Sequence, residues 1–580
     1  MFHKARSTTL ATLALLLSGC GGTVGVSSSS GSAQAAVSIA ASAPAKPSAA
    51  ASAAPAASAK PSAAASAAAS PAAKPSGNTF VWGKSGDAVK LDPAIIDDGE
   101  SSEVTHAMFE GFVRFKPGTT DVEPALAEKW QSSTDGLTWT FNLRKGVKFH
   151  DGTDFNADAV KFNFDRWSDD KNQFRPTKEN EGVGFEYWHD FMLIDDKKPM
   201  FKSLDVVDPS TVKLTINYPY SPLLHNLAMF PFVFSSPTAI KKDPNKYSES
   251  PVGTGPFKFV EWVHDDHVTV AANKDYWGGA PKVDQLVFKV IKDNAARFLQ
   301  MKAGAIQGME FPNSDDVAAA KTDPNLQVVL TPPLNVAYVG MNISKKPFDD
   351  PKVRQAMAYA INKQPIIDAF YKDTGKPAKE LLAPGMLGYD DSIQDYAYDA
   401  NKAKQLLSDA GLASGFKTDF WYMPVSRPYY PNPKDIATAI GSDLNKVGVQ
   451  TNIQTEDWKD YLKDRYTSKF QMWMLGWTGD NGDPDNFYCT WFCTYAADQA
   501  THTWNNQDAI NNLKKAATLT DDQQRAALYK QVDKQVHDEV PFVPMAHNSP
   551  PNFLLKSATG FVPNPVGDYD FTNLALGKQP

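Results

Sequence analysis

The composition of residues 21–77 limits what this chain can fold into, and it separates an N-terminal leader (1–77) from a body (78–580). Ala, Ser and Pro make up 43 of these 57 residues, and residues 1–77 contain no acidic side chain. Such a stretch has little to bury, so the roughly 1–2 kcal/mol of backbone entropy lost per ordered residue is not offset. We therefore expect residues 20–77 to be a disordered tether and assign all folded structure to 78–580.

The first 20 residues have the layout of an export signal. Two basic residues precede an apolar run over 10–17, which is too short for the roughly 20 residues that cross a bilayer. Residues 17–20 (Leu-Ser-Gly-Cys) resemble the lipobox of bacterial lipoproteins, in which the cysteine is acylated. We predict a signal peptide over 1–19 and a lipid anchor on Cys20, with the body in the periplasm or at the cell surface. The alternative is an ordinary signal with a chance cysteine.

Composition excludes several classes of protein for the body. Without the five basic residues of the leader, residues 78–580 carry 53 bases and 66 acids, a charge of −13. This balance does not suit a nucleic-acid coat, and it weakly favours cationic or amine-bearing partners. Three cysteines are too few for a cysteine-rich zinc protein or a disulfide scaffold. We expect no cofactor and no metal, and we assign the pair His264 and His267 to a solvated turn.

Short strands and helices alternate along the body. Runs rich in β-branched and aromatic residues predict strands over 79–82, 138–143, 211–217, 283–291 and 449–455. Apolar residues at helical spacing predict helices over 349–363, 399–410, 434–446 and 521–539. The alternation through 334–548 indicates an α/β lobe.

Four motifs occur in order along the body, over 139–152, 156–165, 253–257 and 348–362. Together they resemble the peptide/nickel family of extracellular solute-binding proteins, which are the receptors of ABC importers. The resemblance covers essentially all of 78–580. It implies an α/β fold that is periplasmic-binding-protein-like, with two hinged lobes and an additional subdomain.

The same resemblance implies how the chain is divided, and we define three names by residue number. Lobe I comprises 78–111, 252–333 and 549–580. The additional subdomain comprises 112–251, and lobe II comprises 334–548.

Two further strings, over 423–429 and 476–487, look most like the dipeptide receptors of this family. In those receptors the arginine that matches Arg427 holds the α-carboxylate of the ligand. The aspartate that matches Asp480 holds its α-amine. The resemblance implies further ligand contacts from Gly476, Trp477, Thr478, Tyr429 and Gly99.

The side-chain chemistry supports this assignment independently. Arginine has a planar fork that binds a carboxylate through two N–H donors, and aspartate accepts hydrogen bonds from an ammonium. Holding both ends of a peptide sets its length, since two residues span roughly 7 Å. The backbone of 476–479 can also pair with an extended ligand. The alternatives are a surface role for Arg427, a turn or incomplete calcium loop at Asp480, and core positions for Trp477 and Tyr429.

The loop after the first strand departs from the dipeptide receptors, which have small hydroxyl residues around the matching glycine. Here Asp97, Asp98 and Glu100 surround Gly99. Acids that face the cleft would favour basic side chains or another amine ligand. Acids that face water would have no such role, and this second arrangement is the one we expect.

Cys489 and Cys493 stand four residues apart. In an oxidising compartment, thiols this close often form a bridge where geometry permits. The resemblance would instead pair a cysteine here with one near position 504, where this chain has a tryptophan. We therefore predict a local disulfide between Cys489 and Cys493.

These observations predict a binding protein and not an enzyme. We expect a tethered, monomeric receptor that delivers dipeptides or short peptides to an ABC permease. The alternatives keep the fold but bind haem, a metal chelate, a longer peptide or another amine, or act as a ligand sensor. A hydrolase that uses Asp483 and Asp485 as paired carboxylates is a further alternative, although nothing sets them across a defined substrate.

Overall fold

The computed structural model describes residues 78–96, 98–176, 185–193, 199–467, 469–493 and 504–577. The predicted signal peptide, Cys20, the predicted tether and Asp97 lie outside the described residues. Helices and strands of the described part build a mixed α/β protein, as predicted. In this part of the chain, no helix is both long enough and apolar enough to cross a membrane.

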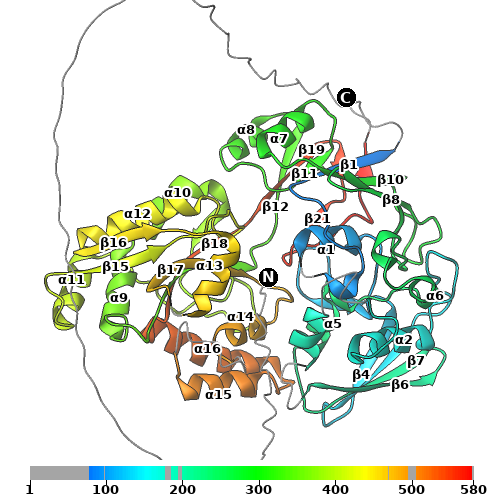
Figure 1. Ribbon diagram of the computed structural model, residues 1–580, viewed down its shortest axis with the longest axis horizontal. Helices are drawn as coiled ribbons and strands as arrows, with labels where there is room; N and C mark the ends of the chain where they lie inside the picture. Colours follow the sequence, from blue (N-terminus) through cyan, green and yellow to red (C-terminus); the bar gives the residue numbers. More distant parts are fainter. Residues whose placement is uncertain are drawn as a thin grey trace, which may run out of the picture. The chain divides into compact units, whose positions relative to one another are not determined.

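Seven of the described strands of lobe I form one sheet around β1 (Figure 1), and β20 (Ala558–Thr559), β23 (Ala575–Leu576), β21 (Val562–Pro563) and β22 (Tyr569–Asp570) form two short antiparallel pairs, β20 with β23 and β21 with β22. β1 is parallel to its neighbours β10 and β11, and the remaining pairs are antiparallel. In spatial order the strands are β12 (Leu326–Leu330), β19 (Pro551–Leu555), β11 (Gly308–Met309), β1 (Thr79–Lys84), β10 (Gln285–Val290), β9 (His267–Ala272) and β8 (Phe257–Val263). Its helices are α1 (Gly99–His106), α7 (Asn294–Lys302) and α8 (Asp316–Thr322). The sheet therefore joins segments from both ends of the body.

The additional subdomain contains an antiparallel sheet of four described strands. Its strands in spatial order are β4 (Ala127–Ser132), β5 (Thr138–Leu143), β7 (Thr211–Ile216) and β6 (Phe201–Asp208). Its described helices are α2 (Ala157–Ser168), α4 (Glu186–Trp188), α5 (Leu223–Leu227) and α6 (Pro237–Lys242). A two-stranded ribbon of β2 (Val113–Phe115) and β3 (Val122–Pro124) precedes this sheet.

Lobe II contains a mixed sheet of six described strands. In spatial order they are β14 (Gly375–Pro377), β18 (Phe542–Asn548), β13 (Asn335–Met341), β17 (Met472–Thr478), β15 (Phe416–Trp421) and β16 (Val449–Gln454). Helices α9 (Pro351–Ala360) and α11 (Ala400–Asp409) contact each other beside the sheet, as do α10 (Lys363–Phe370) and α12 (Pro433–Lys446) (Figure 1). The remaining helices of lobe II are α13 (Trp458–Asp464), α14 (Pro484–Phe492), α15 (Gln507–Ala516) and α16 (Asp522–Glu539).

The predicted helices and strands are confirmed to within three residues at each end. Local signals explain this agreement. Asp350 accepts a hydrogen bond from the first turn of α9, where Pro351 is the first residue. Asp521 caps α16 in the same way, through the N–H of Gln524. The domain boundaries themselves remain a prediction, although each of the three larger sheets takes its strands from one predicted part.

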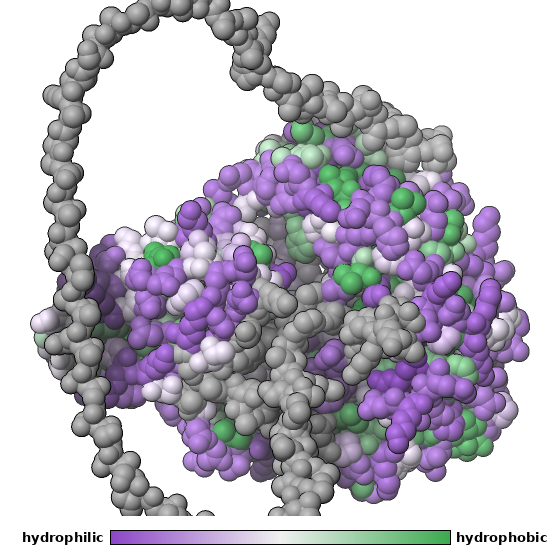
Figure 2. All heavy atoms as spheres, viewed as in Figure 1, coloured by the Kyte–Doolittle hydropathy of each residue, from purple (hydrophilic) through white to green (hydrophobic). Residues whose placement is uncertain are grey.

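Separate hydrophobic clusters lie under these sheets. The largest, in lobe II, includes Val336, Trp473 and Phe542, and a second in the additional subdomain includes Phe141 and Trp167. The molecular face in Figure 2 is mostly hydrophilic, with apolar side chains in small separate groups. Burial of apolar side chains under each sheet therefore accounts for the fold.

Candidate functional site

The strand β17 has one edge that is open over most of its length. It pairs with β13 from Asn335↔Thr478 to Met341↔Met472, but with β15 only at Met472 and Trp473. At the open edge the carbonyl of Met474 accepts a hydrogen bond of 2.7 Å from the Tyr461 hydroxyl. Because backbone groups of alternate residues point the same way, Gly476 and Thr478 also direct their N–H and C=O groups toward this edge.

Arg427 lies in a tight turn between β15 and α12. The backbone N–H groups of Arg427 and Tyr430 donate to each other's carbonyls at 3.0 Å. The half-buried Arg427 side chain holds its guanidinium carbon 5.0 Å from the centre of the Trp458 ring. Among the described residues no carboxylate forms an ion pair with Arg427, so its charge is not compensated there.

Tyr429 connects this turn to β17. A Cβ added at Gly476 would lie 2.3 Å from Tyr429 Cδ2 and 2.5 Å from the carbonyl oxygen of Val336. Glycine is therefore required at this position because the tyrosine ring packs directly onto the strand. Tyr429 itself is buried, and its carbonyl accepts a hydrogen bond from the Tyr371 hydroxyl.

Asp480 follows β17 after a single residue and is held by neutral donors. The side-chain amide of Asn486 donates to Asp480 Oδ2 at 3.0 Å, and the Tyr187 hydroxyl donates to Oδ1 over a long 3.4 Å. Burial raises the pKa of Asp480, and these two hydrogen bonds partly oppose that rise. No described cation pairs with this carboxylate, so a partner ammonium would complete it.

Trp477 and Thr478 occupy the last positions of β17. The Trp477 indole donates to Asn486 Oδ1 at 3.1 Å, and the same oxygen accepts the backbone N–H of Asp480 at 2.9 Å. Trp477 thus orients the asparagine that orients Asp480. Thr478 is half-buried and pairs with Asn335 of β13.

Asp483 and Asp485 have different surroundings from Asp480. Asp483 caps α14, and both of its oxygens accept hydrogen bonds from Arg525 Nη2, at 2.8 and 2.7 Å. Asp485 accepts a hydrogen bond of 2.9 Å from the Tyr220 hydroxyl. Burial and the neighbouring Asp483 raise the pKa of Asp485 to about 7. Both carboxylates are committed to contacts within the protein, which does not fit the hydrolase alternative.

The acids around Gly99 do not all face water. Asp98 caps α1 by accepting the N–H of Ser101 at 2.8 Å, and Gly99 begins this helix with open space around it. Glu100 turns inward, where Oε1 accepts from the Ser85 hydroxyl at 2.8 Å and Oε2 lies 3.1 Å from Lys84 Nζ. The expectation of water-facing acids is therefore wrong for Glu100, because a buried lysine attracts it.

Three carboxylates beside β1 form the group of described residues best arranged to hold a metal ion. Oxygens of Glu100, Glu103 and Glu310 lie within 4.8 Å of one another. The ammonium of Lys84, 1 % exposed, contacts Glu103 and Glu100. Burial alone would lower the pKa of Lys84, but the attraction of these carboxylates outweighs it and raises the pKa. Lys84 thus supplies the positive charge that the cluster requires.

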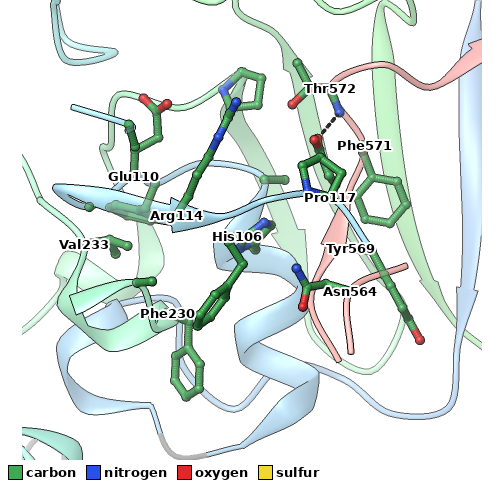
Figure 3. A pocket seen from close by; sticks show the side chains of 18 of the residues that line it. His106, Glu110, Arg114, Pro117, Phe230, Val233, Asn564, Tyr569, Phe571 and Thr572 are labelled. Atoms are coloured by element: carbon green, nitrogen blue, oxygen red, sulfur yellow. Dashed lines mark hydrogen bonds between the residues drawn. The ribbon is translucent and has the colours of Figure 1, made fainter. Parts of the chain in front are cut away.

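A cavity between α1, β2 and the C-terminal segment offers about 60 Å³ of space, enough for about four water molecules (Figure 3). None of the predicted ligand residues lines it. Side chains from separate segments reach it, including His106, Arg114, Phe230 and Asn564 (Figure 3). The Phe230 ring lies 4.9 Å from that of Tyr187, so the cavity adjoins the residues that hold Asp480. It is too small to hold a whole dipeptide.

Cys489 and Cys493 lie at the end of α14, with their sulfur atoms 2.05 Å apart as in a disulfide.

His264 and His267 flank the turn between β8 and β9. His264 Nε2 lies 3.5 Å from Glu249, and His267 Nε2 lies 3.4 Å from Glu261. The two histidines thus face different carboxylates.

The sequence interpretation missed several residues of this site. Asn486 belongs to the string that suggested Asp480, and its position in the first turn of α14 was a usable signal. Tyr187, Trp458 and Tyr461 come from distant parts of the chain, and no local pattern connects them to the site.

The chain matches the family described as "Bacterial extracellular solute-binding proteins, family 5 Middle" over residues 121–499. It belongs to this family, as the motifs predicted. Members of this family are substrate-binding transport proteins of ABC importers, and the predicted periplasmic-binding-protein-like fold is confirmed.

Individual relatives are similar over almost their whole length. The dipeptide-binding protein of Escherichia coli is 39 % identical over 512 residues, 86 % of this chain and 94 % of the relative. The heme-binding protein A of Haemophilus influenzae is 39 % identical over 506 residues, 85 % of this chain and 91 % of the relative. The solved structure of DppA from Helicobacter pylori in complex with the peptide STSA has a TM-score of 0.73 and 32 % identity, and covers 86 % of this chain and 98 % of its own.

Proposed function

We propose that this protein captures dipeptides or short peptides by their charged ends outside the cytoplasm and delivers them to an ABC permease. The single observation that carries this proposal is the open edge of β17. The Arg427 guanidinium lies over Trp458, whose ring stacks on that of Tyr461, and the Tyr461 hydroxyl donates to Met474 at this edge. Asp480 follows the other end of the strand, and neither it nor Arg427 is ion-paired by a described residue. Gly476 and Thr478 direct backbone groups to the same edge.

The chemistry of a free peptide matches this arrangement. Its carboxylate would bind the fork of Arg427, and its ammonium would bind Asp480. Its backbone would pair with the open strand edge, which accepts any side chain. The peptide-bound structure from Helicobacter pylori and the dipeptide-binding relative of Escherichia coli support this ligand class.

Delivery follows from a change in the balance between open and closed forms. A ligand that contacts both lobes favours the closed form by its differential affinity, and the permease would recognise that form. The N-terminal signal and a lipid on Cys20 would keep a monomeric receptor outside the cytoplasm, close to its permease. Loss of membrane association in a Cys20→Ser variant would support this part of the proposal.

Calorimetry with a dipeptide tests the ligand contacts. We expect Arg427→Ala and Asp480→Ala each to weaken binding about 10- to 100-fold, because a hydrogen bond to a charged group contributes roughly 1.5–3 kcal/mol. C-terminal amidation of the peptide should reproduce the first loss. Asp409→Ala on α11, which is exposed, is the matched control and should leave binding unchanged. Undiminished affinity in both site variants would contradict the proposal.

Haem is the second candidate, because the Haemophilus influenzae relative is named for it. Titration of the purified protein with haemin, followed by absorbance, separates the two. A stoichiometric spectral change that a dipeptide does not compete away would favour haem, and mass spectrometry of the co-purified ligand gives an independent answer.

A further inference from the structure

Asn226, on α5 of the additional subdomain, is fully buried and links two segments that meet at Asp480. Its Oδ1 accepts a hydrogen bond of 2.7 Å from the side-chain amide of Asn481 in lobe II. Its Nδ2 donates to the carbonyl of Phe191 at 3.1 Å. The side-chain amide of Asn226 therefore uses both of its polar atoms, the oxygen as an acceptor and the nitrogen as a donor.

The first link fixes the loop that carries Asp480. Asn481 is the next residue in the chain, and its amide is buried against Asn226. The loop also packs closely on the additional subdomain, since a Cβ added at Gly482 would lie 2.3 Å from Thr120 Cβ. The backbone next to Asp480 is thus held from the additional subdomain.

The second link fixes the hydroxyl that donates to Asp480. Phe191 lies in the turn His189–Leu193, and its ring stacks on that of Tyr187 with centroids 5.3 Å apart. The Tyr187 ring also meets Phe230 edge-on at 4.9 Å. Holding the carbonyl of Phe191 therefore restrains the ring whose hydroxyl donates to Asp480 Oδ1.

We propose that Asn226 is a positioning residue for the amine subsite, which orients Asp480 from both sides toward peptides with a free N-terminal amine. This inference rests on the function proposed above. A neutral amide suits this role because it fixes the carboxylate without supplying a cation that would compete with the ligand ammonium. The additional subdomain thereby contributes to the choice between free and blocked peptides.

Calorimetry with two ligands tests the role: a dipeptide and its desamino analogue, which lacks only the N-terminal amine. Wild type should bind the dipeptide more tightly. In Asn226→Ala we expect this preference to fall about tenfold while affinity for the desamino analogue changes less than about twofold. Asn217→Ala is the matched control, because that exposed amide donates only within the additional subdomain. It should retain the full preference.

Tyr187→Phe gives a second test, which removes only the hydroxyl and remains available if Asn226→Ala fails to fold. We expect it to show the same selective loss of preference for the dipeptide. Equal weakening of both ligands in the variants, or an unchanged preference, would overturn the inference. Failure of the proposed function looks different: wild type itself would then bind both ligands equally or neither.

Discussion

Two regions of the molecule each gather three carboxylates. The cluster beside β1 concentrates its acids, since oxygens of Glu100, Glu103 and Glu310 lie within 4.8 Å of one another. Lys84 is buried among them, and burial raises the pKa values of both Glu103 and Glu310. The positive charge of this cluster comes from within the protein.

The loop after β17 separates its acids onto different partners. Asp483 is neutralised by Arg525, and Asp485 accepts from the Tyr220 hydroxyl. Asp480 has only neutral donors among the described residues. Close spacing of carboxylates therefore does not by itself mark a ligand site, because a cation from within the protein can neutralise the cluster.

Removal of the lysine from the cluster beside β1 should give the largest effect. We expect Lys84→Met to lower the free energy of unfolding by about 3–5 kcal/mol, because it leaves buried carboxylates without a cation. Urea denaturation followed by circular dichroism measures this change. Lys84→Met combined with Glu103→Leu should recover part of the loss, since it replaces the pair by apolar groups.

A contrasting control is Lys402→Ala on α11, where the side chain is exposed and a change below about 0.5 kcal/mol is expected. If Lys84→Met were equally mild, the cluster would have to be neutralised by protonation alone. In that case the cluster beside β1 would not depend on a cation from within the protein, and the contrast with Asp480 would be lost.

How much of each region was predictable depends on the range of the contacts. Arg427 and Asp480 were predicted from strings within lobe II, whereas the helix α14 was not predicted, although its cap Asp483 and the following Pro484 are a local start signal. The hydrogen bond between Asn226 and Asn481 joins residues 255 positions apart, and that between Tyr187 and Asp480 joins residues 293 apart. Such contacts depend on how distant segments meet, which no periodicity encodes.

The inward turn of Glu100 was not predictable for the same reason. The acids around Gly99 resemble a solvated turn in sequence, and Asp98 indeed caps α1. The partner of Glu100 is Lys84, the last residue of β1, which lies two residues beyond the predicted strand and whose burial no local pattern indicates. Only the packing of α1 against β1 reveals the pair.

The next largest effect is the change with pH of the free energy of unfolding that we expect from Asp485. Its pKa of about 7 in the folded protein lies above the roughly 3.9 of unfolded aspartate. Its contribution to stability is therefore fully present below about pH 4 and is lost as pH rises through about 7. We expect the unfolding free energy of wild type to fall relative to Asp485→Asn between pH 5 and 8, measured by urea denaturation at each pH.

Asp522→Asn is the matched control for this pH effect, since Asp522 lies 3.5 Å from the same Arg525 but is 76 % exposed. Because its side chain is exposed, this substitution should change the free energy of unfolding by less than about 0.5 kcal/mol. Parallel curves for Asp485→Asn and wild type would contradict the raised pKa of Asp485.

The smallest effect is expected at the rim of the cluster beside β1. Glu100 is 30 % exposed, and its Oε1 accepts from Ser85 while only Oε2 faces Lys84. In Glu100→Gln the amide oxygen can still accept from Ser85, and the lost attraction to Lys84 is offset by weaker repulsion of Glu103 and Glu310. We expect the free energy of unfolding to change by less than about 1 kcal/mol, as for other partly exposed pairs. A loss near that of Lys84→Met would show instead that Glu100, and not the buried Glu103, is the principal partner of the lysine.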